Sequence, residues 1–132
     1  MGCDCSQSRT IKQSHNIYEF LDNLEINIIL LNEELRKLSS KSKDIFILGK
    51  RVIKVSEDLL EVLKKVESYD LMSTDWETMR DAADVCFTYY YNCYSSLNNF
   101  PTKDEENQER KFINAEKELR NKRKELMSLL KR

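Results

Sequence analysis

The spacing of the apolar residues constrains the fold of this chain more than any other feature. From Ile17 to Leu130, apolar residues recur in steps of three and four positions, which places them along one face of an α-helix. Only two glycines and one proline occur among the 132 residues, so few positions favour a loop. The pattern predicts an all-α protein with a single domain.

Three breaks divide the pattern into four amphipathic segments. The breaks are Ser39–Ser42, Ser68–Ser73 and Asn98–Pro101. Amphipathic helices joined by short turns bury their apolar faces against one another, so we expect an antiparallel four-helix bundle over residues 16–132. The helices are expected over residues 16–38, 42–67, 75–98 and 103–131.

The repeat also predicts which residues face the core and where the last two helices begin. Thr74 with Glu77, and Thr102 with Glu105, match the capping box that starts a helix, with the threonine as the N-cap. The residues expected to face inward are Ile17, Leu21, Leu24, Ile28, Leu31, Leu35, Leu38, Ile45, Leu48, Val52, Leu59, Leu63, Val66, Trp76, Met79, Ala83, Cys86, Tyr90, Cys93, Leu97, Phe112, Ala115, Leu119, Leu126 and Leu130.

A long-helix coiled coil is the alternative fold. The apolar spacing from Ile17 to Val66 keeps nearly heptad phase through Ser39–Ser42, so one long helix could form a dimeric coiled coil, a homo-oligomer. The serines of this cluster and Gly49 would lie on the seam that such a dimer must fill. They favour the break, and therefore the bundle.

Residues 1–15 are expected to form a flexible leader that anchors the protein to a membrane. After Met1, Gly2 with Ser6 matches the pattern for N-terminal myristoylation. One myristoyl chain gives only reversible binding, with an association constant of about 10⁴ M⁻¹, and Cys3 and Cys5 are placed to add palmitate. The leader resembles those of Src-family kinases and G-protein α subunits, which carry a palmitoylated cysteine directly after the myristoylated glycine.

The rest of the sequence gives no other means of membrane attachment. The longest apolar runs, Ile28–Leu31 and Ile45–Leu48, are far shorter than the roughly 20 residues that span a bilayer. The first residues are polar, unlike a secretory signal peptide. We therefore expect the protein on the cytosolic face of the plasma membrane or of an endomembrane.

The sequence predicts neither an enzyme nor a metal site. Gly49 is the only glycine after the leader, which excludes a glycine-rich phosphate loop, and His15 is the only histidine. Cys86 and Cys93 are expected to lie about 10 Å apart on one helical face, too far for a disulfide, as reduced core thiols. The net charge of −1 gives no argument for nucleic acid. Covalent myristate and palmitate are the only added groups expected.

Basic residues gather in two regions. The end of the fourth segment holds the candidates for contact with an anionic leaflet, which are Arg120, Lys122, Arg123, Lys124, Lys131 and Arg132. They also suit the negative end of a helix dipole, and in this region Glu125 alone opposes them. A second basic face could comprise Lys41, Lys43, Lys50, Arg51 and Lys54, although a solvated helix surface is the commoner explanation of such residues.

The second and fourth helices resemble a known membrane-active domain. The similarity rests on Leu48-Gly49-Lys50-Arg51-Val52, Lys111-Phe112, Lys117-Glu118-Leu119 and Lys124-Glu125-Leu126-Met127-Ser128-Leu129-Leu130. These residues are similar to the N-terminal four-helix bundle of the mixed-lineage kinase domain-like pseudokinase and its HeLo-type relatives. The resemblance implies a bundle that oligomerises and engages anionic phospholipid. A permanent lipid leader would remove the recruitment step on which such domains rely.

Two functions follow from the sequence. The first is a lipid-anchored, non-enzymatic adaptor or scaffold that binds a protein partner at the cytosolic leaflet. The alternative is a membrane-active bundle that oligomerises on anionic lipid and permeabilises it. The coiled-coil fold would instead give a structural dimer that lines a membrane.

Overall fold

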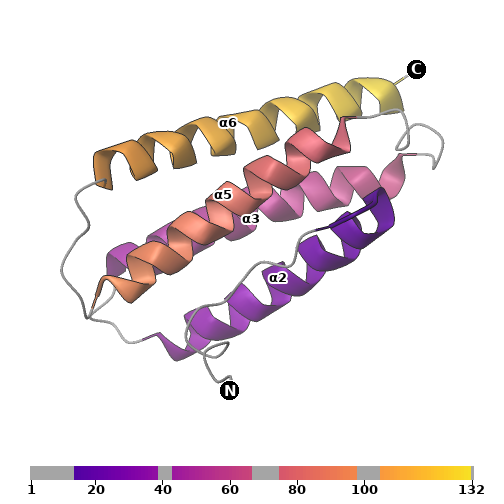
Figure 1. Cartoon of the computed structure of the whole chain (residues 1–132). Helices are drawn as coiled ribbons and strands as arrows, with labels where there is room; N and C mark the ends of the chain where they lie inside the picture. The colour runs from indigo at the N-terminus through magenta and orange to yellow at the C-terminus, as the bar shows by residue number, and fades with distance from the viewer. Residues whose placement is uncertain (1–13, 39–42, 67–74, 98–104, 132) are drawn as a thin grey trace.

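The computed structural model describes residues 14–38, 43–66, 75–97 and 105–131. They form four helices, α2 (Ile17–Lys37), α3 (Lys43–Lys65), α5 (Trp76–Ser95) and α6 (Glu105–Leu130). Consecutive helices run in opposite directions, so the expected all-α, antiparallel four-helix bundle is confirmed (Figure 1). The single long helix is wrong for this chain, because α2 ends at Lys37 and packs alongside α3.

The bundle is built around α3. This helix packs against all three others, and α5 packs closely on α6. Helix α2 rests mainly on α3 and has only a small contact with α5. The second and fourth helices, α3 and α6, are therefore direct neighbours that run in the same direction (Figure 1). In a square bundle with this up-and-down order they would lie diagonally opposite each other.

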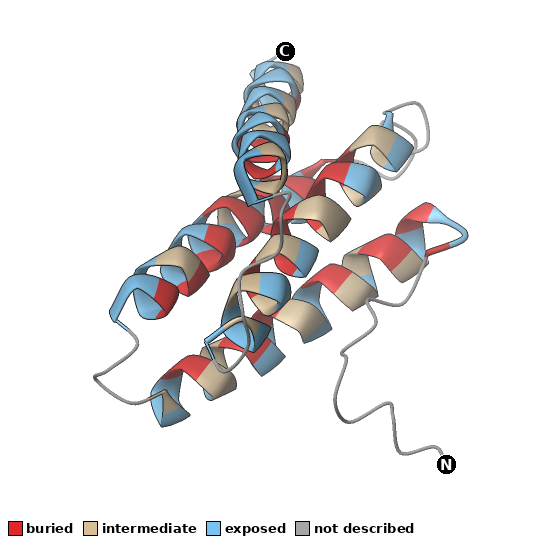
Figure 2. Cartoon of the chain, turned by 60° about the vertical axis from the view of Figure 1, so that its left-hand side comes forward, coloured by how far each residue is buried: buried red, intermediate tan, exposed pale blue. Residues whose placement is uncertain are grey.

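The central place of α3 explains the core residues of this helix that the sequence pattern missed. A single stripe was expected on each helix, but α3 must bury the surface that it presents to three neighbours. Buried residues accordingly line the inner sides of the helices (Figure 2). The additional buried apolar residues of α3 are Ile53, Val55, Leu60 and Val62.

Two residues expected to face inward are exposed instead. Leu97 is 47% exposed and Leu130 is 40% exposed. Leu97 follows the end of α5 and Leu130 is the last residue of α6, so neither lies where the described parts of the other helices cover it. Apolar periodicity identifies a face of a helix but not the point at which its neighbours end.

The structure differs from the expected N-cap at α5 and shows a further N-cap at α2. The N-cap of α5 is Asp75 rather than Thr74, because the Asp75 carboxylate accepts hydrogen bonds from both the backbone N–H and the hydroxyl of Thr78. At α2, the Asn16 side chain accepts from the N–H of Glu19 at 2.9 Å, a cap that the sequence analysis did not identify. The expected Thr102 cap lies outside the described residues.

Gly49 allows α2, α3 and α5 to approach one another. A Cβ atom at this position would lie 2.7 and 2.9 Å from the two methyl carbons of Leu35 on α2. It would also lie 3.1 Å from a ring carbon of Tyr90 on α5. Leu35 and Tyr90 are both buried, so neither side chain can move without displacing core neighbours.

We predict that Gly49→Val lowers the free energy of unfolding by about 2 kcal/mol, because a branched side chain overpacks this contact. Gly49→Ala is the matched control. Its gain of about 1 kcal/mol in helix propensity offsets the displacement of Leu35, which leaves stability nearly unchanged. Urea unfolding followed by circular dichroism measures both. A valine variant as stable as the wild type would show that the three helices do not approach closely at Gly49.

Candidate functional site: a basic groove between α3 and α6

A buried carboxylate joins α3 to α6. The side chain of Glu116 on α6 is 4% exposed. Arg51 on α3 donates to both of its oxygens, at 2.6 and 3.3 Å, and Arg120 lies 3.0 Å away, one turn further along α6. A buried carboxylate requires such partners, since an unpaired buried charge is strongly destabilising. The hydrogen bond to Glu116 raises the pKa of Arg51 above its ordinary value.

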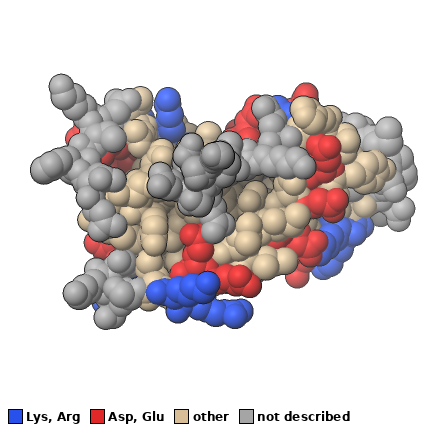
Figure 3. All heavy atoms as spheres, turned by 60° about the horizontal axis from the view of Figure 1, so that its bottom comes forward, with Lys and Arg blue, Asp and Glu red and all other residues tan. Residues whose placement is uncertain are grey.

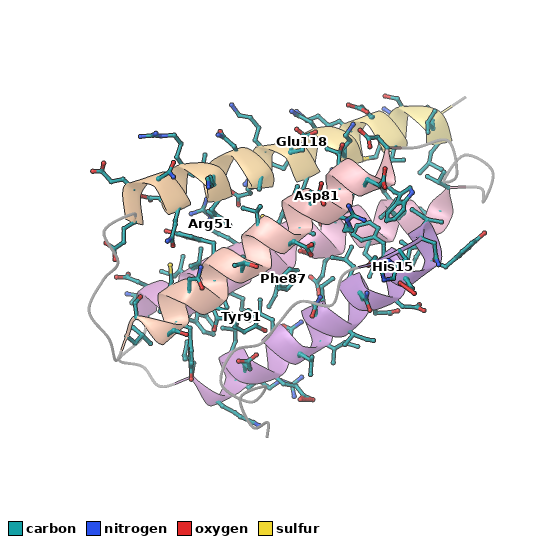
Figure 4. All side chains as sticks on the ribbon, viewed as in Figure 1. His15, Arg51, Asp81, Phe87, Tyr91 and Glu118 are labelled. Carbon is teal, nitrogen blue, oxygen red and sulfur yellow. The ribbon has the colours of Figure 1, made fainter. Side chains whose placement is uncertain are left out.

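An aromatic stack holds the Arg51 side chain in place. Its guanidinium lies 4.9 Å from the ring centre of Phe112, and Phe112 stacks on Tyr89 with ring centres 4.8 Å apart. Arg51 thus lies between α6 and the helices beneath it (Figure 4). Stacking and a forked ion pair are both interactions that arginine makes better than lysine.

A half-enclosed groove of about 370 Å³ is lined in part by Arg51, Glu116 and Arg120. Its lining comes from residues spaced i, i+3, i+4 and i+7 on α3, and i, i+4, i+7 and i+8 on α6. They are Arg51, Lys54, Val55, Asp58, Glu116, Arg120, Arg123 and Lys124. Five basic side chains thus face two carboxylates. The groove unites parts of the two basic regions that the sequence analysis treated separately.

The cations of the groove are not equally neutralised. Arg51 and Arg120 share Glu116, and Lys54 lies 3.3 Å from Asp58. Arg123 and Lys124 have no ion pair with any residue that the structure describes. The Nε of Arg123 is also buried with no hydrogen-bond partner among those residues. The groove therefore holds donors that its own carboxylates leave unused.

The other candidates for membrane contact lie elsewhere. Lys122 is only 14% exposed, and its amino group lies 3.9 Å from Asp75 and 3.6 Å from Glu125. Lys131 is exposed at the end of α6, and Arg132 lies outside the described residues. The expectation that Glu125 alone opposes this basic region was wrong. Glu116 pairs with Arg120, and Asp75 pairs with Lys122.

A second, smaller cavity of about 240 Å³ lies between α5 and α6. Its lining combines Asp84 with mostly uncharged residues, namely Val85, Thr88, Tyr89, Asn92 and Gln108, together with Lys111. Burial raises the pKa of Asp84 to about 6, and the nearby charge of Asp81 adds to this rise while Arg80 opposes it.

The thiols and the leader complete the set of sequence candidates. Cys86 and Cys93 are free, Cys86 is fully buried, and burial raises the pKa of its thiol to about 12. Such a thiol is a poor nucleophile at neutral pH. Gly2, Cys3 and Cys5 lie outside the described residues. Among the described residues, no helix combines the length and the apolar character needed to cross a bilayer.

No family model, curated protein or solved structure matches this chain.

We predict that Arg51→Ala lowers the free energy of unfolding by about 2–4 kcal/mol, because it leaves the buried Glu116 carboxylate with Arg120 alone. A double variant, Arg51→Met with Glu116→Leu, removes both charges and should unfold within about 1 kcal/mol of the wild type. Urea denaturation of the single and double variants tests this difference. A loss below about 0.5 kcal/mol for Arg51→Ala would mean that the pair acts as a surface ion pair.

We predict that Asp84→Asn stabilises the protein at pH 7 by about 1–2 kcal/mol, with little effect at pH 4. The pKa of Asp84 is about 6 in the folded protein and about 4 in the unfolded chain, so between these values the folded state binds more protons. The free energy of unfolding of the wild type should therefore fall as pH rises through this window. In the Asp84→Asn variant, the contribution of this carboxyl group to that decrease should be absent. Parallel pH profiles for both proteins would contradict the shift.

Proposed function

We propose that this protein is a lipid-anchored, non-enzymatic helical-bundle adaptor on the cytosolic face of a membrane. The spacing of Gly2, Cys3, Cys5 and Ser6 supports acylation, with myristate on Gly2 and palmitate on the two cysteines. Acyl chains of two kinds would turn reversible binding into stable anchoring. The bundle would then be the part that engages a protein partner.

The observation that carries the proposal is that the start of α2 and the C-terminal end of α6 lie at the same end of the bundle (Figure 1). An Arg80 nitrogen on α5 donates to the Ser14 carbonyl at 3.0 Å, which holds Ser14, shortly before α2, at this end. Lys122 pairs there with Asp75, at the start of α5. The acylated leader and the exposed Lys131 would thus address the same leaflet, and a basic residue near an anionic surface adds about 1 kcal/mol.

The outer face of α2 offers a surface for a protein partner. Ile26, Ile29 and Leu30 are 52%, 53% and 37% exposed, and their spacing places them side by side on the helix. On the face seen in Figure 3, uncharged residues occupy a broad area between groups of charged ones. Adjacent apolar residues on a helix suit the packing of another helix.

The same helix favours one alternative, a bundle that inserts into anionic membranes and permeabilises them. Helix α2 has a small contact with α5 and depends mainly on α3, while apolar residues line both its inner and outer faces. Dye release from vesicles containing phosphatidylserine separates the two functions. The adaptor should release no dye at concentrations that saturate the vesicles, whereas a membrane-active bundle should release it.

We predict that Gly2→Ala moves the protein from the membrane fraction to the soluble fraction, because palmitoylation of Cys3 and Cys5 follows myristoylation at the membrane. Cys3→Ser with Cys5→Ser should give an intermediate, readily extracted protein. Fractionation of cells expressing each form, with labelling by myristate and palmitate analogues, measures the effect. A Gly2→Ala protein that still sediments with membranes would refute the leader as the anchor.

A further inference from the structure

We infer that the groove between α3 and α6 binds an acidic segment of a protein partner. The inference rests on the proposed adaptor function and states the chemistry of the partner. The groove brings together five basic side chains from two helices, and three of these, Lys54, Arg123 and Lys124, do not contact Glu116. Its excess of positive charge calls for a ligand that carries several negative charges.

The protein itself shows which ligand chemistry the groove accepts. The Glu116 carboxylate occupies one side, where it takes two hydrogen bonds from Arg51 and one ion pair from Arg120. A forked guanidinium matches a carboxylate in this way wherever the two meet. An aspartate or glutamate from a partner would meet a guanidinium at Arg123 and an ammonium group at Lys124, neither of which forms an ion pair with any residue that the structure describes.

The position of the groove favours a protein over the bilayer surface. It lies along the middle of α3, from Arg51 to Asp58, rather than at the end of the bundle where α2 begins. A leaflet held at that end would face the helix ends, while the groove opens on the flank. The groove is also half enclosed, so a ligand must project side chains into it. At about 1.5 Å per residue, its length along α3 is about 10 Å, which suits two or three residues of an extended segment.

Two of the groove arginines, Arg51 and Arg120, are already ordered by contacts within the protein. Arg51 is fixed by the Phe112 ring and by Glu116, and Arg120 is fixed by the same carboxylate. Binding an acidic segment would therefore require ordering mainly the Lys54, Arg123 and Lys124 side chains. The cost in side-chain entropy then falls on these three side chains rather than on all five.

The test uses the full chain carrying Gly2→Ala, so that binding is measured in solution and apart from membrane attachment. The probe is fluorescein-labelled hexaglutamate, with labelled hexaglutamine as the uncharged control, and fluorescence polarisation reports binding at low salt. The groove variant combines Lys54→Gln, Arg123→Gln and Lys124→Gln. The matched control removes the same charge outside the groove with Lys43→Gln, Lys50→Gln and Lys131→Gln, all at exposed positions.

We expect the groove variant to bind hexaglutamate about tenfold more weakly, and the control variant to bind it within about twofold of the parent chain. Thermal unfolding should show that both variants fold. Equal weakening by the two variants would overturn the inference in favour of nonspecific charge attraction. A second result would also overturn the inference. If hexaglutamate does not bind, but vesicles containing phosphatidylserine bind through the same three residues, the groove is a membrane site. Neither failure bears on acylation, which the fractionation of Gly2→Ala decides separately.

Discussion

The buried Glu116 carboxylate is the constraint on which the arrangement of α3 and α6 depends. A carboxylate that is almost fully buried must keep its partners, and its main partner, Arg51, comes from the other helix. The ion pair therefore fixes the register between two helices that are 65 positions apart at this contact. Arg120 pairs with the same carboxylate, so Glu116 holds a second cation in the lining of the groove.

The periodicity of apolar residues predicted the helices well, because local residue spacing alone determines which face of a helix is apolar. Residues such as Leu24, Ile28 and Leu31 are buried as the stripe on α2 requires. The extent of burial on α3 was underpredicted, since Ile53 and Val62 lie off the main stripe and are covered only because three helices surround this one. The start of α5 was misassigned for a similar reason. Thr74 and Asp75 are both good caps, and only the conformation of the chain decides whether the helix starts with Thr74 bonded to Glu77 or with Asp75 bonded to Thr78.

The groove could not be predicted from the sequence. Its basic residues were identified, but as two separate regions, because an up-and-down bundle places consecutive helices together and leaves the second and fourth apart. Lys122, which belongs to the same run of charges as Arg123, turns toward Asp75 instead. Two observations could have suggested the groove. Arg51, Lys54 and Asp58 share one face of their helix, and Glu116 is an acid within an otherwise apolar stripe, between Ala115 and Leu119.

The proposed function assigns different tasks to different surfaces of a small bundle. The end where α2 begins would face the membrane, while the groove and the outer side of α2 lie along the length of the helices. A partner held on the flank would then lie beside the protein and close to the leaflet. Anchoring would confine the protein to a thin layer, which would raise its effective concentration for a partner at the same membrane and allow a groove with few contacts to be occupied. The modest size of the groove is consistent with this arrangement, because the anchor would supply the affinity that the groove lacks.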